Sequence, residues 1–201
     1  MILLTGGTGL VGLAILDQLK SQGLACTALV RTAEGAAVVS ARGARPLQGS
    51  VEDPTAWARV GGISAVIHAA ALLSSREGWA AFARVNVGGT GLAAARARAL
   101  GIRLIHLSSV AVYGDVSRLP DASVAEDHRW TPLSAPNVYA KSKREAERMV
   151  WSEAAKGLEA IVLRPCPVYG AGDRLFIPRL WAAARRGWMP LIGAGDRPVP
   201  L

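Results

Sequence analysis

Short apolar runs alternate with longer stretches of helical periodicity along almost the whole chain. The apolar runs predict strands over residues 2–4, 24–30, 45–48, 65–70, 103–107 and 159–163. Stretches in which apolar residues recur every three or four positions predict helices over residues 10–19, 33–42, 79–100, 137–147 and 175–187. Strands that alternate with helices in this way favour a doubly wound α/β fold, in which helices cover both faces of a parallel sheet.

Glycines interrupt this pattern directly after the first predicted strand. Gly6, Gly9 and Gly12 lie between that strand and the body of the helix predicted from Leu10. Glycine adopts the backbone angles of a tight turn, and it lets a pyrophosphate approach the N–H groups at the positive end of a helix. The spacing is G-x-x-G-x-x-G, whereas the common dinucleotide fingerprint is G-x-G-x-x-G. The strand and helix on either side favour phosphate binding over a purely structural turn.

The end of the second predicted strand bears on the choice of cofactor. Proteins that select NAD carry an acidic residue about 20 positions after the glycines, where it binds the ribose 2′-hydroxyl. Val30 and Arg31 occupy this region here. A guanidinium would bind a 2′-phosphate through paired, charge-assisted hydrogen bonds, so the sequence favours NADP and keeps NAD as the alternative. An ordinary solvated arginine at a strand end is the competing interpretation.

Composition and charge exclude several other classes of protein. With 51% hydrophobic residues in a chain of 201, a globular domain is expected and a disordered chain is not. The net charge of +8 is scattered, without the interleaved aromatic residues that stack on bases, so no nucleic-acid partner is expected. Cys26 and Cys166 have neither disulfide nor metal spacing, so no metal site is expected. Without a signal peptide or a long apolar span, a cytoplasmic protein with no membrane partner is predicted.

Several polar residues lie where parallel strands would end, or on the helix that follows. His68 has no companion ligand, so a buried, hydrogen-bonded structural histidine is the favoured interpretation. Ser108 and Ser109 follow the fifth strand, at the edge where such sheets bind ligands. Tyr139 and Lys143 lie four positions apart, which stacks them on one helix face. A nearby ammonium stabilises a phenolate, so Tyr139 is a candidate acid and base, and Ser109 is a candidate to hold the same substrate oxygen.

Segments that carry these residues form a joint pattern. In chain order they are Thr5–Gly12 (TGGTGLVG), His68–Ala71 (HAAA), Asn86–Thr90 (NVGGT), Ser108–Gly114 (SSVAVYG), Tyr139–Lys143 (YAKSK) and Arg164–Gly170 (RPCPVYG). This pattern resembles the extended short-chain dehydrogenase/reductase superfamily, in its NAD(P)-dependent epimerase/dehydratase group. The resemblance covers nearly all of the chain and implies a Rossmann-type fold.

The resemblance implies a role for each matching residue. Tyr139 would be the acid and base, Lys143 would lower its pKa and hold the nicotinamide ribose, and Ser109 would donate to the substrate oxygen. Alignment on the end of the Ser108–Gly114 segment selects Ser109 over Ser108. The implied cofactor contacts are Gly6, Thr8, Gly9, Leu10, Val11, Gly12, Arg31, Ser50, Val51, Ala69, Ala70, Ala71, Asn86, Tyr139, Lys143, Pro165 and Val168.

Departures from the family pattern narrow the reaction. Ser50 stands where many members carry an aspartate that binds the adenine amino group. Val110 and Ala111 stand where sugar 4,6-dehydratases of the family carry an acidic pair, and this argues against a dehydratase.

The sequence thus predicts an NAD(P)-dependent oxidoreductase that transfers hydride between the cofactor and a secondary alcohol or ketone of a small-molecule substrate. A reductase or a hydroxysteroid-dehydrogenase-like enzyme is favoured, and a nucleotide-sugar epimerase that retains its NAD is the alternative. A non-catalytic dinucleotide-sensing protein is the alternative of another class. A homodimer is left open.

The domain organisation is predicted from the same resemblance. Residues 1–172 are expected to form the dinucleotide-binding domain, and residues 173–201 to begin a smaller substrate-binding lobe that is longer in other members. We therefore expect a truncated chain, in which Trp181 and Trp188 present apolar surface that the rest of the lobe would cover.

Overall fold

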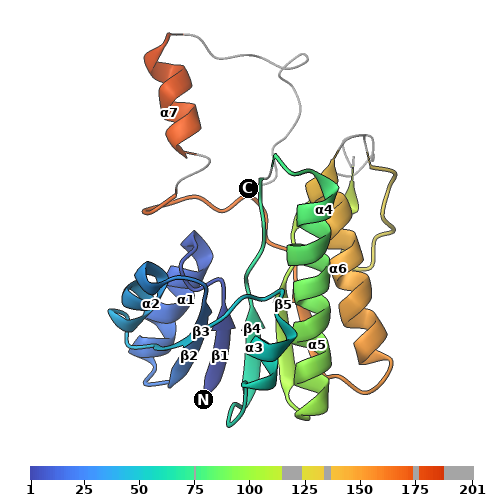
Figure 1. Ribbon diagram of the computed structural model, residues 1–201. Coiled ribbons are helices and arrows are strands. Elements are labelled where there is room, and N and C mark those ends of the chain that lie inside the picture. The colour runs from blue at the N-terminus through green and yellow to red at the C-terminus, as the bar shows by residue number, and fades with distance from the viewer. Residues whose placement is uncertain (75, 115–123, 134–136, 174–176, 188–201) are drawn as a thin grey trace.

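A parallel sheet forms the centre of the computed structural model, which describes residues 1–74, 76–114, 124–133, 137–173 and 177–187 (Figure 1). The strands are β1 (Ile2–Thr5), β2 (Cys26–Val30), β3 (Arg45–Gln48), β4 (Ala65–His68), β5 (Arg103–Leu107) and β6 (Ala160–Leu163). They lie in the order β3-β2-β1-β4-β5-β6, and all neighbours pair in parallel. The register places Thr5 opposite His68, and His68 opposite His106.

Helices connect the strands and cover the sheet. They are α1 (Leu10–Ser21), α2 (Ala33–Ser40), α3 (Pro54–Ala58), α4 (Trp79–Phe82), the π-helical segment η1 (Ala83–Gly88), α5 (Gly89–Ala99), the short 3₁₀ turn η2 (Val110–Tyr113), α6 (Val138–Ala154) and α7 (Ile177–Arg185). Figure 1 shows α1 and α2 on one side of the sheet and α5 and α6 on the other. The predicted doubly wound, Rossmann-type α/β fold is confirmed.

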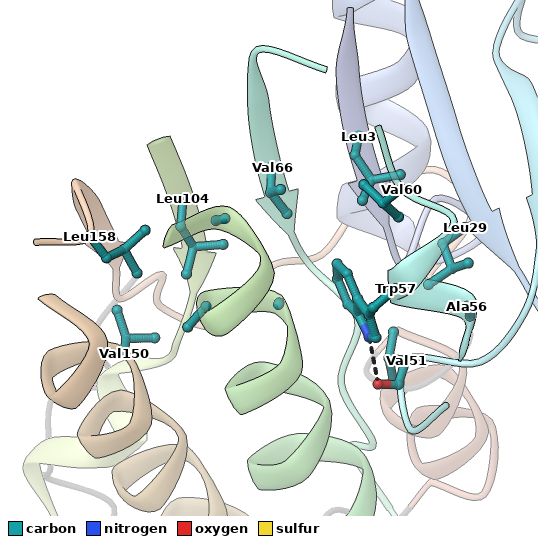
Figure 2. Close-up of a cluster of buried hydrophobic side chains, with 13 residues drawn as sticks. Leu3, Leu29, Val51, Ala56, Trp57, Val60, Val66, Leu104, Val150 and Leu158 are labelled. Carbon is teal, nitrogen blue, oxygen red and sulfur yellow. Dashed lines mark hydrogen bonds between the residues drawn. The ribbon is translucent and has the colours of Figure 1, made fainter. Parts of the chain in front are cut away.

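Two apolar cores lie on opposite faces of the sheet. Because side chains alternate in direction along a strand, the neighbours Leu3 and Leu4 belong to different cores. Leu3 packs in the cluster that includes Leu104 and Trp57, which Figure 2 shows between the strands and the helices of one face. Leu4 packs with Val39 of α2 and other residues of the opposite face. Burial on both faces explains why the strands are almost continuously apolar in sequence.

Element boundaries depart from the predicted ones where local backbone chemistry intervenes. β2 begins at Cys26 rather than at Leu24, because the chain turns at Gly23, whose φ is +66°. The sequence pattern does not predict α3. The Asp53 side chain caps this helix by accepting a hydrogen bond of 2.8 Å from the backbone of Thr55, and a proline occupies its first turn.

Two of the observed helical regions also differ in detail from the predicted ones. The helix predicted over residues 79–100 consists of α4, η1 and α5 in succession, and the wider η1 segment carries Asn86. The helix predicted over residues 175–187 contains α7, none of whose residues is buried. Trp181 is 67% exposed, as predicted, whereas Trp188 lies outside the described residues.

The described residues can be checked for membrane-spanning helices, metal-ligand groups and disulfides. Within them, no helix has the length and apolar character needed to cross a bilayer. They also contain no group of three or more His, Cys, Asp or Glu side chains that could hold a metal ion. Both cysteines are free thiols, with Cys26 buried and Cys166 partly exposed.

Candidate active site

The turn after β1 requires glycine at two positions. Gly6 has a φ of +74°, and a Cβ there would lie 2.6 Å from the backbone nitrogen of Ala70. A Cβ at Gly12 would lie 2.1 Å from the carbonyl oxygen of Gly6. The turn is therefore pressed against both α1 and the segment after β4. No side-chain hydrogen bond caps α1 at Gly9, so the first N–H groups of this helix can bind an anion.

This turn lies where the strand order reverses, with β2 on one side of β1 and β4 on the other. Doubly wound sheets bind ligands beyond the carboxyl ends of the strands at such a point. Ala69 and Ala70 follow β4, and their backbone nitrogens donate to the carbonyl and hydroxyl oxygens of Thr5 at 3.3 and 3.2 Å. These two alanines and Ala71 are partly exposed, so small side chains lie at the carboxyl edge of the sheet here.

Beyond β2 and β3, the predicted adenosine contacts divide into accessible and buried residues. Arg31 directly follows β2 and is exposed. Ser50 is partly exposed, and its hydroxyl accepts a hydrogen bond from the backbone nitrogen of Glu52 at 3.3 Å. Val51 packs in the core close to Gly89 and is only 9% exposed. Its side chain therefore contributes to the core, and its contact with a cofactor stays a prediction.

Ser109 and Tyr139 come from different elements and meet at the carboxyl edge of the sheet. Ser109 follows β5 and caps η2, accepting a hydrogen bond of 3.2 Å from the Ala111 nitrogen. Tyr139 lies in the first turn of α6, where Asn137 is the N-cap. Burial raises the pKa of Tyr139 above its ordinary value of 10, and a side-chain hydrogen bond with Ser109 opposes this rise. The phenol is therefore protonated at neutral pH.

Lys143 lies one turn after Tyr139 and is 3% exposed. Its Nζ donates to the carbonyl oxygen of Leu107, at the end of β5, over 2.7 Å. Burial lowers the pKa of Lys143 to about 8, although the Glu147 carboxylate opposes the shift. The sequence predicts that this ammonium lowers the pKa of Tyr139. In the structure burial is the largest influence on the pKa of Tyr139 and raises it, and the effect of the ammonium on this pKa stays a prediction.

A series of buried hydrogen bonds begins at His68, the last residue of β4. Its Nδ1 lies 2.9 Å from the Thr5 hydroxyl, and its Nε2 lies 3.2 Å from the Thr90 hydroxyl. Thr90 gives its only hydroxyl hydrogen to the carbonyl oxygen of Asn86, so it must accept from Nε2, and Thr5 must donate to Nδ1. Burial lowers the pKa of His68 to about 3, and Lys143 adds to the effect. The interpretation of His68 as a hydrogen-bonded structural histidine is confirmed.

The chain of hydrogen bonds continues through Asn86 to the catalytic candidate. The Asn86 amide exchanges two hydrogen bonds with the backbone of Leu72 and donates to the Ser142 hydroxyl at 2.8 Å. Ser142 in turn donates to the carbonyl oxygen of Tyr139 at 2.8 Å. Asn86 is 1% exposed. It therefore supports the first turn of α6 through Ser142, and its contact with a cofactor stays a prediction.

His106 is a buried polar residue that the sequence analysis does not single out. Its ring stacks on His68 with centroids 5.6 Å apart, because the register sets the two residues side by side. In the part of the chain that the structure describes, neither ring nitrogen of His106 has a hydrogen-bond partner, and neither does the Ser108 hydroxyl. Burial lowers the pKa of His106 well below its ordinary value, so the ring is neutral.

A buried ion pair, also missed from the sequence, joins α6 to the segment after β6. Arg164 donates through Nε and Nη2 to the two carboxylate oxygens of Glu147 at 2.9 and 2.8 Å. The Glu147 side chain is fully buried. Its position four residues after Lys143 was the available signal, since that spacing puts both residues on the same helix face.

The remaining predicted contacts lie around the crevice with varied exposure. Thr8 and Gly9 are exposed, Leu10 and Val11 are partly exposed, and Gly12 is buried. After β6, the Pro165 carbonyl accepts a hydrogen bond of 3.1 Å from the Val110 nitrogen. Val168 is 47% exposed. Together, the glycine turn at the switch point and the paired hydroxyls of Ser109 and Tyr139 define a Rossmann-type dinucleotide-binding protein with candidate acid–base residues.

Comparison with known proteins gives the particular family. Residues 2–197 match the family described as the NAD dependent epimerase/dehydratase family, and the chain belongs to it. It is 38% identical to the 4-hydroxy-2-methyl-3-oxo-4-farnesyl-3,4-dihydroquinoline-1-oxide ketoreductase of Stigmatella aurantiaca, over 90% of this chain and 54% of that protein. It is 31% identical to the 2-alkyl-3-oxoalkanoate reductase of Stenotrophomonas maltophilia, over 98% of this chain and 60% of the relative.

Solved structures agree with this assignment. A short-chain dehydrogenase/reductase superfamily protein from Agrobacterium tumefaciens with bound NAD is 29% identical, with a TM-score of 0.74 over 93% of this chain and 59% of the other. MoeE5 in complex with UDP-glucose and NAD is 31% identical, with a TM-score of 0.72 over 92% of this chain and 61% of the other. The chain thus spans little more than half the length of the curated relatives that it matches.

Proposed function

We propose that this chain forms the dinucleotide-binding and acid–base part of an NAD(P)-dependent oxidoreductase that acts on a secondary alcohol or ketone. The closeness of the Ser109 and Tyr139 side chains, with Lys143 one turn away, carries the proposal. Two hydroxyls from separate elements converge where one substrate oxygen could contact both. The names of the two curated relatives, a ketoreductase and an oxoalkanoate reductase, support a reductase.

The residues around the glycine turn fit a dinucleotide. A Cβ would fill the space at Gly6 and Gly12, and the uncapped N-terminus of α1 presents N–H groups to a pyrophosphate. Ala69, Ala70, Ala71, Pro165 and Val168 would border the rest of the cofactor. When bound, the nicotinamide supplies the hydride for reduction or accepts it in oxidation.

The acid–base residues of the chain would handle the proton. In reduction, the protonated Tyr139 gives its hydroxyl hydrogen to the substrate oxygen, and Ser109 donates a second hydrogen bond to that oxygen as negative charge develops there. Lys143, with a pKa of about 8, is mostly charged at neutral pH and stabilises the resulting phenolate through space. In oxidation the same residues act in the opposite direction.

Cofactor choice and domain organisation belong to the same proposal. Arg31 is exposed beyond β2, where an acid would select NAD, and this supports NADP as the preferred cofactor with NAD as the alternative. Residues 1–172 would form the dinucleotide-binding domain. Residues from 173 onward would belong to a substrate-binding lobe, since α7 has no buried residue and exposes Trp181.

An epimerase that retains its NAD is the second candidate function. MoeE5, which is 31% identical, binds UDP-glucose and NAD, and the same serine and tyrosine could move a proton on a sugar hydroxyl. A retained cofactor would be found in the purified protein, whereas a reductase exchanges its cofactor with solution.

A cofactor and substrate screen tests the proposal. The purified chain is titrated with NADPH and NADH, and nucleotide fluorescence reports binding. Loss of nicotinamide absorbance is then followed with β-keto acids, alkyl ketones, steroid ketones and UDP-sugars. We expect binding of at least one nucleotide and consumption with a ketone. Binding of neither nucleotide would contradict the proposal, and size-exclusion chromatography of the same sample gives the oligomeric state.

A further inference from the structure

The Glu147–Arg164 ion pair lies beside the proposed acid–base residues. Tyr139, Lys143 and Glu147 occupy successive turns of α6 and share one face of that helix. Arg164 directly follows β6 and grips both oxygens of the Glu147 carboxylate. A paired contact of this kind fixes orientation as well as distance, because the planar guanidinium matches the carboxylate geometry.

The same guanidinium also holds the turn that carries Ser109. Arg164 Nη1 donates to the Tyr113 hydroxyl at 2.8 Å, and the guanidinium lies over the Tyr113 ring, 4.9 Å from its centroid. Tyr113 is the last residue of η2, and Ser109 is the N-cap of that segment. The residue after Arg164 adds a second attachment, since the Pro165 carbonyl accepts from Val110, the first residue of η2.

A third segment is tied to the same point. Arg164 Nη1 also donates to the Glu126 carbonyl at 2.7 Å. From the described residues 124–133, Thr131 donates to the Tyr113 carbonyl through its nitrogen and its hydroxyl, at 3.0 and 2.8 Å. Arg164 therefore contacts α6, η2 and residues 124–133 at once. Arg144 of α6 also links these segments, since it donates to the Val112 carbonyl at 2.7 Å and to the Thr131 carbonyl, but only Arg164 of the two bonds to the Glu147 carboxylate and the Tyr113 hydroxyl.

Overall stability does not require a pair of this kind. Joint replacement of a buried ion pair by apolar residues of similar volume is often neutral or stabilising, whereas removal of one partner leaves an unpaired charge. What apolar residues cannot reproduce is the fixed direction of the hydrogen bonds from Arg164 to Glu147 and Tyr113.

We propose that Arg164 is a positioning residue, which sets the Ser109 turn against the Tyr139 face of α6 through its contacts with Tyr113 and Glu147. The inference rests on the proposed function for its consequence in catalysis, but the placement of Ser109 against Tyr139 can be measured without cofactor or substrate. Burial and the Ser109 contact set the pKa of Tyr139, and Glu147 acts on the pKa of Lys143. Tyr113→Phe leaves every charge in place, so a change in the Tyr139 pKa of that variant reports the Ser109 contact.

The test is the titration of Tyr139 in the full chain. The chain has three tyrosines, so subtraction of the tyrosinate absorbance of a matched Tyr139→Phe protein isolates Tyr139 in each background. Ser109→Ala gives the reference shift for loss of the contact. The test variants are Tyr113→Phe, which removes one hydroxyl, and the double variant Glu147→Met with Arg164→Met, which keeps the site uncharged and filled. Circular dichroism in the same titration confirms that each protein stays folded.

A matched control uses a second ion pair on the same helix. Arg98 of α5 bonds to Glu153 near the end of α6, away from η2. We expect the Glu147→Met, Arg164→Met protein to raise the Tyr139 pKa as far as Ser109→Ala does, and Tyr113→Phe to raise it by a smaller amount. Arg98→Met with Glu153→Met should leave the titration unchanged.

Kinetics extend the test once a substrate is found. The double variant at Glu147 and Arg164 should lower kcat by roughly 10²-fold, the effect of a small misplacement of reacting groups, while KM and nucleotide binding stay unchanged. Arg164→Lys keeps the charge but cannot make the paired contact with Glu147 and the bond to Tyr113 together, so its turnover should stay below that of wild type. An unchanged Tyr139 titration in both test variants, with a clear shift in Ser109→Ala, would overturn the inference, whatever the outcome of the substrate screen.

Discussion

The glycine turn and the region below Tyr139 differ in the chemical groups that form them. At the glycine turn the candidate ligand site consists of backbone, and the adjacent core, with Leu4 and Val39, is apolar. Below Tyr139 the buried side chains are polar, and His68 and Asn86 are held by hydrogen bonds. An added side-chain atom should disrupt the glycine turn. Loss of a hydrogen-bonding side chain should disrupt the polar region below Tyr139. The predictions below test this difference, from the largest expected effect to the smallest.

Gly12→Ala should damage the backbone site most. The added Cβ would lie 2.1 Å from the Gly6 carbonyl oxygen, and backbone cannot move aside as a side-chain tip can. Overpacking of this severity should cost about 3 kcal/mol of unfolding free energy and abolish nucleotide binding. Urea unfolding and nucleotide fluorescence measure the two effects. The matched control is Gly61→Ala, where nothing lies within 4 Å of the new methyl group. Normal nucleotide binding by Gly12→Ala would show that the turn is not the phosphate site.

Lys143→Met should raise the unfolding free energy of the protein at neutral pH. The pKa of this lysine falls from 10.5 in the unfolded chain to about 8 in the fold, so the folded state pays for the buried charge below pH 8. Removal of the ammonium should raise the unfolding free energy at pH 7 by up to ~3 kcal/mol, less the cost of leaving the Leu107 carbonyl without this partner.

The pH dependence distinguishes this explanation from simple packing. Wild-type stability should rise relative to Lys143→Met as pH increases from about 8 to 10.5, because only the unfolded chain stays protonated over that range. Urea unfolding at pH 7 and pH 10 measures the difference. Lys20→Met, at an exposed position, should show no such trend. A stability gap that is constant with pH would contradict a buried charge.

Arg31→Ala should affect only nucleotide choice at the backbone end. If the guanidinium binds a 2′-phosphate, NADPH binding should weaken by about 1.5–3 kcal/mol, while NADH binding stays nearly unchanged. Fluorescence titration with both nucleotides measures this. Arg103→Ala, at the opposite edge of the sheet, is the control and should change neither affinity. Equal losses for NADPH and NADH would end the NADP assignment.

His106→Phe is the mildest change at the polar end. It removes two buried ring nitrogens that have no partner among the described residues, so stability at pH 7 should rise by about 1 kcal/mol. The folded pKa of His106 lies below its ordinary value of 6.5, so wild-type stability falls as pH drops below 6.5, and the variant should lose less. Melting temperatures at pH 7 and pH 5 measure both effects. With His128→Phe as the control outside the sheet, equal acid sensitivity of wild type and His106→Phe would contradict this account.

The glycine turn and the elements on either side of it could be predicted from the sequence because their determinants are local. Glycine spacing between an apolar run and a periodic stretch predicts β1, the turn and α1 within a few residues. The pair Tyr139 and Lys143 was also predictable, because four positions along a helix fix their relation. The start of β2 was missed, since the turn at Gly23 has no signature distinct from a continued apolar run.

The polar end could not be predicted in the same way, because its contacts depend on tertiary structure. The stacking of His68 on His106 follows from strand register, which the sequence does not state. The pairing of Glu147 with Arg164 joins a helix to the end of the next strand. Lys143 was expected on the helix face of Tyr139, and its binding to the Leu107 carbonyl depends on how α6 packs against β5. Buried polar contacts of this kind cannot be predicted from the sequence pattern, because they depend on how the elements pack.

The Tyr139→Phe protein tests the central claim most directly. Nucleotide affinity and ketone turnover are measured side by side in wild type and variant, with the most active substrate of the screen. Loss of the hydroxyl should lower turnover by roughly 10²- to 10⁴-fold and leave nucleotide affinity unchanged, because the proton donor and the phosphate site are at different ends of the crevice. Full turnover by Tyr139→Phe would contradict the account and favour a protein that binds the dinucleotide without using this tyrosine in catalysis.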